Sequence, residues 1–209
     1  GGTGSLLLLT GEAGAGRTRV LNETLALAKV REFGVLRARG GQLERELTFG
    51  VARQLLESRV LRADREGPNP LLSGAARHAG PLLGAGSEPA RDMDEPSLVH
   101  ALFWVVSNLA EAGPLCVAVD DAQWSDPASL RLLAYLSRRV DELPVVVVVA
   151  AQSGEPEAPQ ELLDELAQQP LSATLELRPL TELASTRLVR NRVDRHADHA
   201  FCQAVHEAA

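Results

Sequence analysis

The sequence predicts an α/β fold: a three-layer sandwich in which helices cover both faces of a mainly parallel, five-stranded sheet. Strand-like apolar runs alternate with helical stretches, which is typical of parallel strands joined by helices. Near-continuous apolar runs such as Val145–Ala150 are typical of strands that are buried on both faces. The chain has 209 residues and 45% hydrophobic composition, enough for one domain with a sizeable core.

Each element of this fold has its own pattern in the sequence. The expected strands are Leu6–Leu9, Val35–Arg39, Leu115–Val119, Val145–Ala150 and Thr174–Leu177. The expected helices are Arg17–Arg31, Leu47–Leu61, Ser97–Ala112, Ala128–Val140 and Gln160–Gln168. The stretch Arg62–Pro96 is rich in Gly, Pro and small residues. Because the strand and helix pattern resumes after it, we interpret 62–96 as a flexible surface insertion within a single domain that covers residues 1–209.

A glycine-rich loop lies between the first expected strand and the first expected helix. It reads Gly11, Glu12, Ala13, Gly14, Ala15, Gly16, Arg17 and Thr18. This is the phosphate-binding P-loop pattern, in which backbone amides surround phosphate oxygens, a cation reaches the outer phosphates and the hydroxyl ligates Mg²⁺. The N-terminus of the following helix also favours an anion. The sequence therefore predicts a P-loop NTPase sandwich that binds ATP or ADP through residues 11–18, with Thr18 as a metal ligand.

One residue of this motif departs from the pattern, because Arg17 stands where a lysine is expected. Lys29 is the only lysine among 21 basic residues, so a general bias toward arginine explains the substitution as well as a functional change does. Arginine keeps the positive charge, but its guanidinium is planar and larger than an ammonium group. Two interpretations stay open at this point: a weakened site, or a variant that still binds.

Two adjacent acids follow the apolar strand Leu115–Val119. The carboxyl ends of parallel strands are where open α/β sheets bind ligands. An acidic pair after a strand also occurs in caps and turns, but its position downstream of a P-loop favours a nucleotide site. We expect Asp120 to hold Mg²⁺ and Asp121 to act catalytically by orienting the attacking water. Asp126, which precedes Pro127, is expected to cap a helix.

Composition excludes several other classes of protein. The formal net charge of −7 argues against direct DNA binding by this segment, and no helix-turn-helix pattern is visible. The longest apolar runs have the length of strands, and the first residues lack a signal-peptide pattern. Cys116 and Cys202 are expected to be core thiols rather than a disulfide or metal site, which points to a cytoplasmic location.

Three segments together carry a family resemblance: the P-loop at 11–18, the stretch at 38–55, and residues 119–126 with the helix that follows them. This combination resembles the ATPase domain of large, MalT-like regulators of the LuxR family, which belong to the STAND branch of AAA-like ATPases. The resemblance spans nearly the whole chain. It implies a nucleotide-controlled switch in which ADP holds a closed state and ATP permits an open, self-associating state, while separate C-terminal helix-turn-helix modules bind promoters.

The chain also departs from this family. Family members carry a segment before the P-loop strand, and a lid, a sensor and a DNA-binding domain after the terminal helix; these are expected to be absent here. The usual Thr-Arg pair after the sensor strand reads Ala151-Gln152, so the arginine that senses the terminal phosphate is missing. Two functions stay open: a nucleotide-binding regulatory switch with weak or no ATP hydrolysis, and a pseudo-ATPase interaction module that has lost the nucleotide.

Overall fold

Five parallel strands form the centre of the molecule. The computed structural model describes residues 4–42, 45–85 and 93–207. The strands lie in the order β2-β3-β4-β1-β5 and all their pairings are parallel. Their bounds are β1 Ser5–Gly11, β2 Gly34–Arg39, β3 Leu115–Asp120, β4 Val145–Gln152 and β5 Ser172–Leu177. The predicted α/β class is confirmed, and each observed strand contains the one expected from the sequence.

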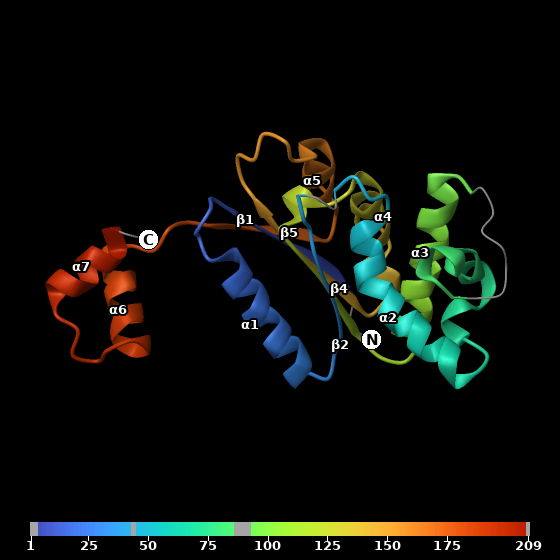
Figure 1. Ribbon diagram of the computed structural model, residues 1–209, viewed down its shortest axis with the longest axis horizontal. Coiled ribbons are helices and arrows are strands. Elements are labelled where there is room, and N and C mark those ends of the chain that lie inside the picture. Colours follow the sequence, from blue (N-terminus) through green and yellow to red (C-terminus); the bar gives the residue numbers. More distant parts are fainter. Residues whose placement is uncertain (1–3, 43–44, 86–92, 208–209) are drawn as a thin grey trace.

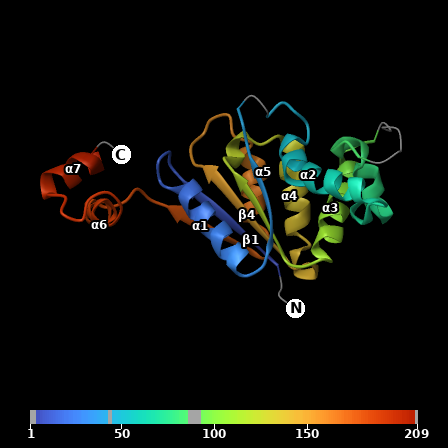
Figure 2. The same ribbon diagram turned by 60° about the horizontal axis from the view of Figure 1, so that its bottom comes forward.

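Helices cover the two faces of this sheet unequally. On one face α1 packs alone, and Leu21 and Leu25 contact the apolar residues of β1, β3 and β4 that point toward it. The opposite face carries the larger core, formed with α2, α3, α4 and α5 (Figures 1 and 2). The helix bounds are α1 Arg17–Val30, α2 Gly50–Glu66, α3 Glu95–Ala110, α4 Pro127–Ser137 and α5 Gln160–Ala167. With the sheet between these two layers of helices, the fold has the predicted three-layer arrangement.

The strand register brings the loops of the expected site to one edge of the sheet. Gly11 at the end of β1 pairs with Gln152 at the end of β4, and Arg39 at the end of β2 pairs with Asp120 at the end of β3. Since β4 lies between β1 and β3, the P-loop and the two acids follow strands separated by a single strand. Residues far apart in the sequence therefore meet at the carboxyl ends of the strands.

The helix α2 begins and ends later than the sequence pattern predicts. The expected helix was Leu47–Leu61, whereas α2 runs from Gly50 to Glu66. Its start is set from outside the segment, because the buried carboxylate of Asp126 accepts hydrogen bonds from the backbone N–H groups of Phe49 and Val51. A boundary fixed by a residue more than seventy positions away is invisible to local periodicity.

The Gly- and Pro-rich stretch contains ordered structure. Residues 62–66 complete α2, and three short 3₁₀ helices follow at Pro70–Leu72, Gly74–Ala79 and Pro81–Leu83. Ala76, Ala79 and Leu83 are fully buried in the larger core, which also contains α3. Residues 86–92 lie outside the described ranges. The flexibility of 62–96 stays a prediction.

Two further helices extend from the end of β5. They are α6 Glu182–Arg192 and α7 His199–Glu207, and Figure 1 shows them apart from the sheet. They bury Val189, Ala197 and Cys202 between themselves as a small separate cluster. The sequence pattern did not predict α6, whose apolar residues are few and mostly exposed. The pair is therefore held by its own contacts rather than by the main core.

The cysteines and several aromatic residues of the described parts pack against their neighbours. Cys116 and Cys202 are buried and free, and burial raises the pKa of the Cys116 thiol. Phe103 is buried beside Trp104, and Arg139 stacks over Tyr135 at 3.8 Å from the ring centre.

Within residues 4–42, 45–85 and 93–207, no cluster of metal-ligating side chains occurs, and no helix has the length and apolar character to cross a membrane.

Candidate nucleotide-binding site

The P-loop is a tight turn between β1 and α1. Gly11 and Ser153 exchange two hydrogen bonds: Gly11 N–H donates to Ser153 Oγ at 3.1 Å, and Ser153 N–H donates to Gly11 O at 2.9 Å. A Cβ at Gly11 would lie 2.5 Å from the carbonyl oxygen of Leu177, so only glycine fits. Gly16 has φ +90° and gives α1 no side-chain cap, which leaves the first amides of the helix to an anion.

The predicted metal ligands of the two motifs meet across the sheet. The hydroxyl of Thr18 donates to Asp120 Oδ1 at 3.2 Å, and Asp121 N–H donates to the same oxygen at 3.1 Å. Asp120 is only 1% exposed, and among the described residues its Oδ2 has no hydrogen-bond partner. Arg37 Nη2 approaches that oxygen to 3.8 Å. A hydroxyl beside a buried carboxylate with a free oxygen fits the oxygen ligands that Mg²⁺ requires.

The second acid, Asp121, is turned toward β2. Its backbone is left-handed, with φ +48°. Arg39 donates to Asp121 Oδ2 from Nε at 2.8 Å and forms an ion pair from Nη2 at 2.7 Å. These contacts raise the pKa of the Arg39 guanidinium, through the hydrogen bond to Asp121 first and its negative charge second. The carboxylate that the sequence assigns to water activation is therefore already engaged by a cation.

Arg17 lies across the P-loop instead of extending away from it. Its Nη1 donates to the carbonyl oxygens of Gly11 and Glu12, the latter at 2.8 Å. Its Nη2 donates to Gln152 Oε1 at 3.4 Å. The planar fork of the guanidinium allows these contacts at once, and a lysine ammonium could not span them in the same way.

A chain of amide side chains connects the ends of β4 and β3. The backbone N–H of Gln152 donates to Gln123 Oε1 at 2.8 Å, and Gln123 Nε2 donates to Asp121 Oδ1 at 3.4 Å. Gln123 is 2% exposed, so this contact is fixed by packing. Gln152, which follows the strand expected to carry the sensor, is thereby in contact with both Arg17 and the acidic turn.

Asp126 has the structural role that the sequence predicts. Its Oδ1 accepts from Ser129 N–H at 2.9 Å, which is the N-cap bond of α4, and Pro127 occupies the first turn. The same carboxylate accepts from Phe49 N–H at 2.8 Å and Val51 N–H at 3.2 Å. It therefore joins the starts of two helices, α2 and α4.

Sequence reasoning missed Arg37 and Arg39 as site residues. They alternate along β2, and the pairing of β2 with β3 places them beside Asp120 and Asp121. Two arginines at alternate positions of β2 indicate contacts with the acidic pair only when the order of the strands is known.

Comparison with known protein families identifies the family of this chain. A family model for the AAA ATPase domain matches residues 1–149, which is most of the chain. The chain belongs to the AAA ATPase domain family. The P-loop, the acidic pair and strands β1, β2 and β3 lie within that match, whereas the end of β4 and the whole of β5 lie outside it.

The AAA ATPase domain is similar to parts of several longer proteins. It is 28% identical over 199 residues to an uncharacterized protein of Rhizobium meliloti strain 1021, covering 86% of this chain and 18% of that protein. Cdc6p of Pyrobaculum aerophilum is similar in structure, with TM-score 0.60, 13% identity and coverage of 97% of this chain and 48% of that chain. A DNA replication initiation factor gives TM-score 0.53 at 9% identity, over 98% of this chain and 50% of that one. The chain thus spans half or less of these relatives, and the structural similarity shows the P-loop fold.

Proposed function

We propose that this AAA ATPase domain is the ATP- and ADP-binding regulatory switch of a cytoplasmic LuxR-type transcriptional regulator of the STAND type, with weak or no ATP hydrolysis. The contact between Thr18 Oγ1 and Asp120 Oδ1 at 3.2 Å is the observation that carries the proposal. It joins the two halves of a nucleotide site that are about a hundred residues apart in the sequence.

Each group at the sheet edge has a definite part in this proposal. The amides of residues 11–18 bind the phosphates, and Thr18 and Asp120 hold Mg²⁺. The bound ion would neutralise charge that builds up on the phosphate oxygens. Asp120 offers its Oδ2 for this purpose, an oxygen that accepts no hydrogen bond from the described residues and lies 3.8 Å from Arg37 Nη2. Asp121 is the group that would orient water, provided that its ion pair with Arg39 breaks.

Three features weaken ATP turnover more than they weaken nucleotide binding. Arg17 is bonded to the loop carbonyls, Asp121 is paired with Arg39, and Gln152 stands where the resemblance expects a phosphate-sensing arginine. A charge-assisted hydrogen bond contributes about 1.5–3 kcal/mol, so the loss of one or two weakens binding by about tenfold to several-hundredfold. Catalysis suffers more, because an arginine directed at the transition state contributes about a thousandfold or more.

The regulatory part of the proposal rests on the family resemblance. The motifs at 11–18, 38–55 and 119–126 resemble those of LuxR-type regulators, whose lid, sensor and DNA-binding domains lie C-terminal to the ATPase domain. In this proposal those domains contact promoters, and the nucleotide controls self-association. The net charge of −7 supports assigning DNA contacts to domains other than this one.

A titration with a fluorescent ATP analogue, with and without Mg²⁺, tests the proposal. We expect saturable binding that Mg²⁺ strengthens, and loss of the Mg²⁺ effect in Asp120→Asn and Thr18→Ala. The matched control is Asp164→Asn, which changes an exposed carboxylate on α5. Binding that is equally strong without Mg²⁺, or that survives both site substitutions, would contradict the proposal. Robust phosphate release by the unmodified chain would contradict the assignment of weak hydrolysis.

The second candidate is a pseudo-ATPase interaction module that has lost the nucleotide. The contacts of Arg17 with Gly11 and Glu12 favour it, because the guanidinium already satisfies carbonyl groups of the loop. The same titration decides between the two. Saturable, Mg²⁺-dependent binding selects the switch, and no binding at millimolar analogue selects the interaction module.

A further inference from the structure

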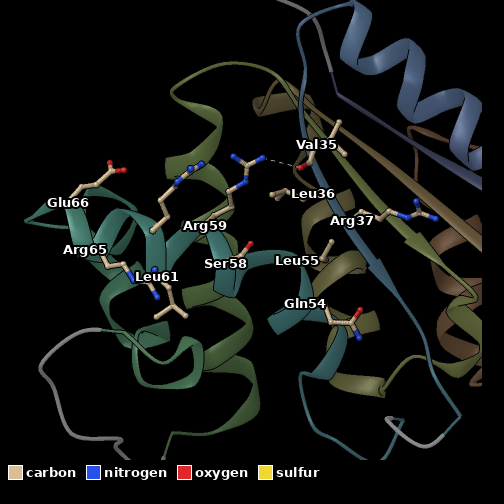
Figure 3. A pocket seen from close by; sticks show the side chains of 11 residues that line it. Val35, Leu36, Arg37, Gln54, Leu55, Ser58, Arg59, Leu61, Arg65 and Glu66 are labelled. Carbon is tan, nitrogen blue, oxygen red and sulfur yellow. Dashed lines mark hydrogen bonds between the residues drawn. The ribbon is translucent and has the colours of Figure 1, made fainter.

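A small pocket lies where α3, α4 and α5 meet, and we call it the α4 pocket. α4 packs against both α3 and α5, and the pocket lined by these three helices has a volume of about 280 Å³. None of its lining residues belongs to the candidate nucleotide site. Figure 3 shows a different pocket, between α2 and β2, whose lining includes Arg37, the neighbour of Asp120. The α4 pocket shares no residue with it and is separate from the proposed nucleotide function.

The floor of the α4 pocket is apolar. Val99 and Ala134 are only 6% and 3% exposed, and Leu162 packs against the larger core. Sites for small molecules have volumes of about 300–1,000 Å³ and combine an apolar lining with a few polar groups. The α4 pocket lies at the small end of that range, which fits a ligand of a few carbon atoms.

Tyr135 forms a wall of the pocket, and its neighbours fix its orientation. Its hydroxyl is hydrogen-bonded to His100 Nδ1 at 2.9 Å, and the guanidinium of Arg139 lies 3.8 Å from its ring centre. Trp104 Nε1 donates to the other ring nitrogen of His100 at 3.0 Å. A site whose side chains are already held in place loses less entropy when a ligand binds. This side of the α4 pocket is therefore preorganised.

An ion pair stands at each end of the pocket. Arg131 pairs with Glu95 at 2.7 Å, and Arg138 pairs with Glu165. The two arginines are about two helical turns apart on α4, which corresponds to about 10 Å. Each end of the pocket therefore offers one positive and one negative group to a ligand.

A ligand with a single charge is a poor match for such an end. An anion that binds Arg138 displaces Glu165 and leaves that carboxylate without its cation, and a bound ammonium leaves Arg138 unpaired in the same way. A zwitterion satisfies both groups, with its carboxylate on the guanidinium and its ammonium on the carboxylate. The Arg138 and Glu165 side chains are 54% and 35% exposed, so opening their ion pair costs little.

Of the two ends, the one formed by Arg138 and Glu165 suits a zwitterion better. Glu165 lies in the last turn of α5, where the helix dipole disfavours a negative charge, so an ammonium beside it relieves repulsion. Glu95 lies instead in the first turn of α3, where the dipole already stabilises its carboxylate. An added ammonium therefore gains more at Glu165 than at Glu95.

We infer that the α4 pocket binds a free α-amino acid with an apolar side chain. The α-carboxylate of the ligand binds Arg138, and its α-ammonium binds Glu165. Its side chain then lies over Val99, Ala134 and Leu162. Ligands that carry phosphate are poor occupants, because the two carboxylates of the lining repel them. This inference goes beyond the proposed function and does not depend on nucleotide.

Isothermal titration calorimetry of the full chain with L-leucine, in the absence of nucleotide, tests the inference. We expect saturable binding with a dissociation constant of about 1 mM or lower. The comparison ligands are 4-methylpentanoate and 3-methylbutylamine, which keep the apolar group of leucine and lack its ammonium and its carboxylate, respectively. Each should bind at least about tenfold more weakly than L-leucine, because one member of the ion pair is then left without a partner.

Two variants identify the residues that hold the charged groups. Arg138→Gln should remove the preference for L-leucine over 3-methylbutylamine, and Glu165→Gln should remove the preference over 4-methylpentanoate. Both variants should bind L-leucine at least about tenfold more weakly than the unmodified chain. The matched controls Arg19→Gln and Glu23→Gln break an exposed ion pair on α1 and should leave the affinity within about twofold.

Unchanged thermal melts of the variants would show that they fold. The inference is overturned if L-leucine shows no saturable binding up to about 10 mM, or if the two comparison ligands bind as tightly as L-leucine. It is also overturned if Arg138→Gln and Glu165→Gln bind L-leucine as the unmodified chain does, or if the α1 controls weaken binding equally. None of these results bears on the proposed nucleotide function, because no nucleotide is present in the titration.

Discussion

Arg39 and Asp121 form a close ion pair at the ends of β2 and β3, with Nη2 and Oδ2 2.7 Å apart. The Arg39 side chain is 70% exposed and the Asp121 side chain 17%, so solvent weakens the pair without removing it. A carboxylate that is paired in this way is a poorer acceptor for a water molecule. Asp120 differs, because among the described residues its Oδ2 accepts no hydrogen bond and Arg37 Nη2 lies 3.8 Å from that oxygen.

Replacement of Arg39 by glutamine should raise ATP turnover. An exposed ion pair contributes about 0.5–1 kcal/mol, so release of Asp121 corresponds to about a two- to fivefold increase. The measurement is steady-state phosphate release at saturating ATP. Arg39→Lys keeps a cation and should stay near the unmodified rate. The assignment fails if Arg39→Gln does not exceed that rate, or if its gain survives the added change Asp121→Asn.

Arg17→Lys should tighten nucleotide binding. A lysine cannot maintain the fork of bonds to Gly11, Glu12 and Gln152, so the loop loses the group that now fills it. We expect the dissociation constant of the ATP analogue to fall by about tenfold or more. Arg19→Lys is the matched control, since Arg19 is exposed on the same helix and pairs with Glu23. Unchanged or weaker binding by Arg17→Lys would contradict this account.

Asp126→Ala should destabilise the whole domain. The carboxylate is 1% exposed and accepts hydrogen bonds from the N–H groups of Phe49, Val51 and Ser129, all of which lose their partner. The free energy of unfolding should fall by about 3–4 kcal/mol and the melting temperature by about 10 °C, as measured by urea and thermal unfolding. Asp94→Ala removes an exposed N-cap of α3 and should lower the free energy of unfolding by clearly less. Equal losses in the two variants would refute the special role of Asp126.

The parts of the site that depend on local geometry could be predicted from the sequence. Gly11 and Gly16 occupy backbone positions that glycine alone tolerates, and their spacing to Thr18 is a property of one turn. Asp120 could be placed because parallel strands end at a common edge. Thr18 and Asp120, the two residues expected to hold Mg²⁺, are hydrogen-bonded to each other in the structure, while their binding of a metal stays a prediction.

Features that depend on which elements become neighbours could not be predicted in the same way. Arg39 reaches Asp121 because β2 lies beside β3, and no local pattern fixes that order. Residues 70–83 lack periodicity, yet burial of Ala76 and Leu83 in the core organises them into short helices. The amphipathic signal of α6 is weak, because that helix packs mainly on α7 and leaves Leu183 and Leu188 exposed.

Removal of residues 180–209 should leave the main domain folded. The two large core clusters contain no residue beyond Ala167, and α6 and α7 bury Val189, Ala197 and Cys202 only against each other. The melting temperature should therefore stay within about 2 °C of that of the full chain, because little buried apolar surface is lost. Leu166→Ala in the full chain shows that the assay responds, since truncation of this fully buried side chain should lower the free energy of unfolding by about 2–5 kcal/mol. A truncated chain that melts as early as Leu166→Ala would mean that the α6–α7 pair supports the sheet.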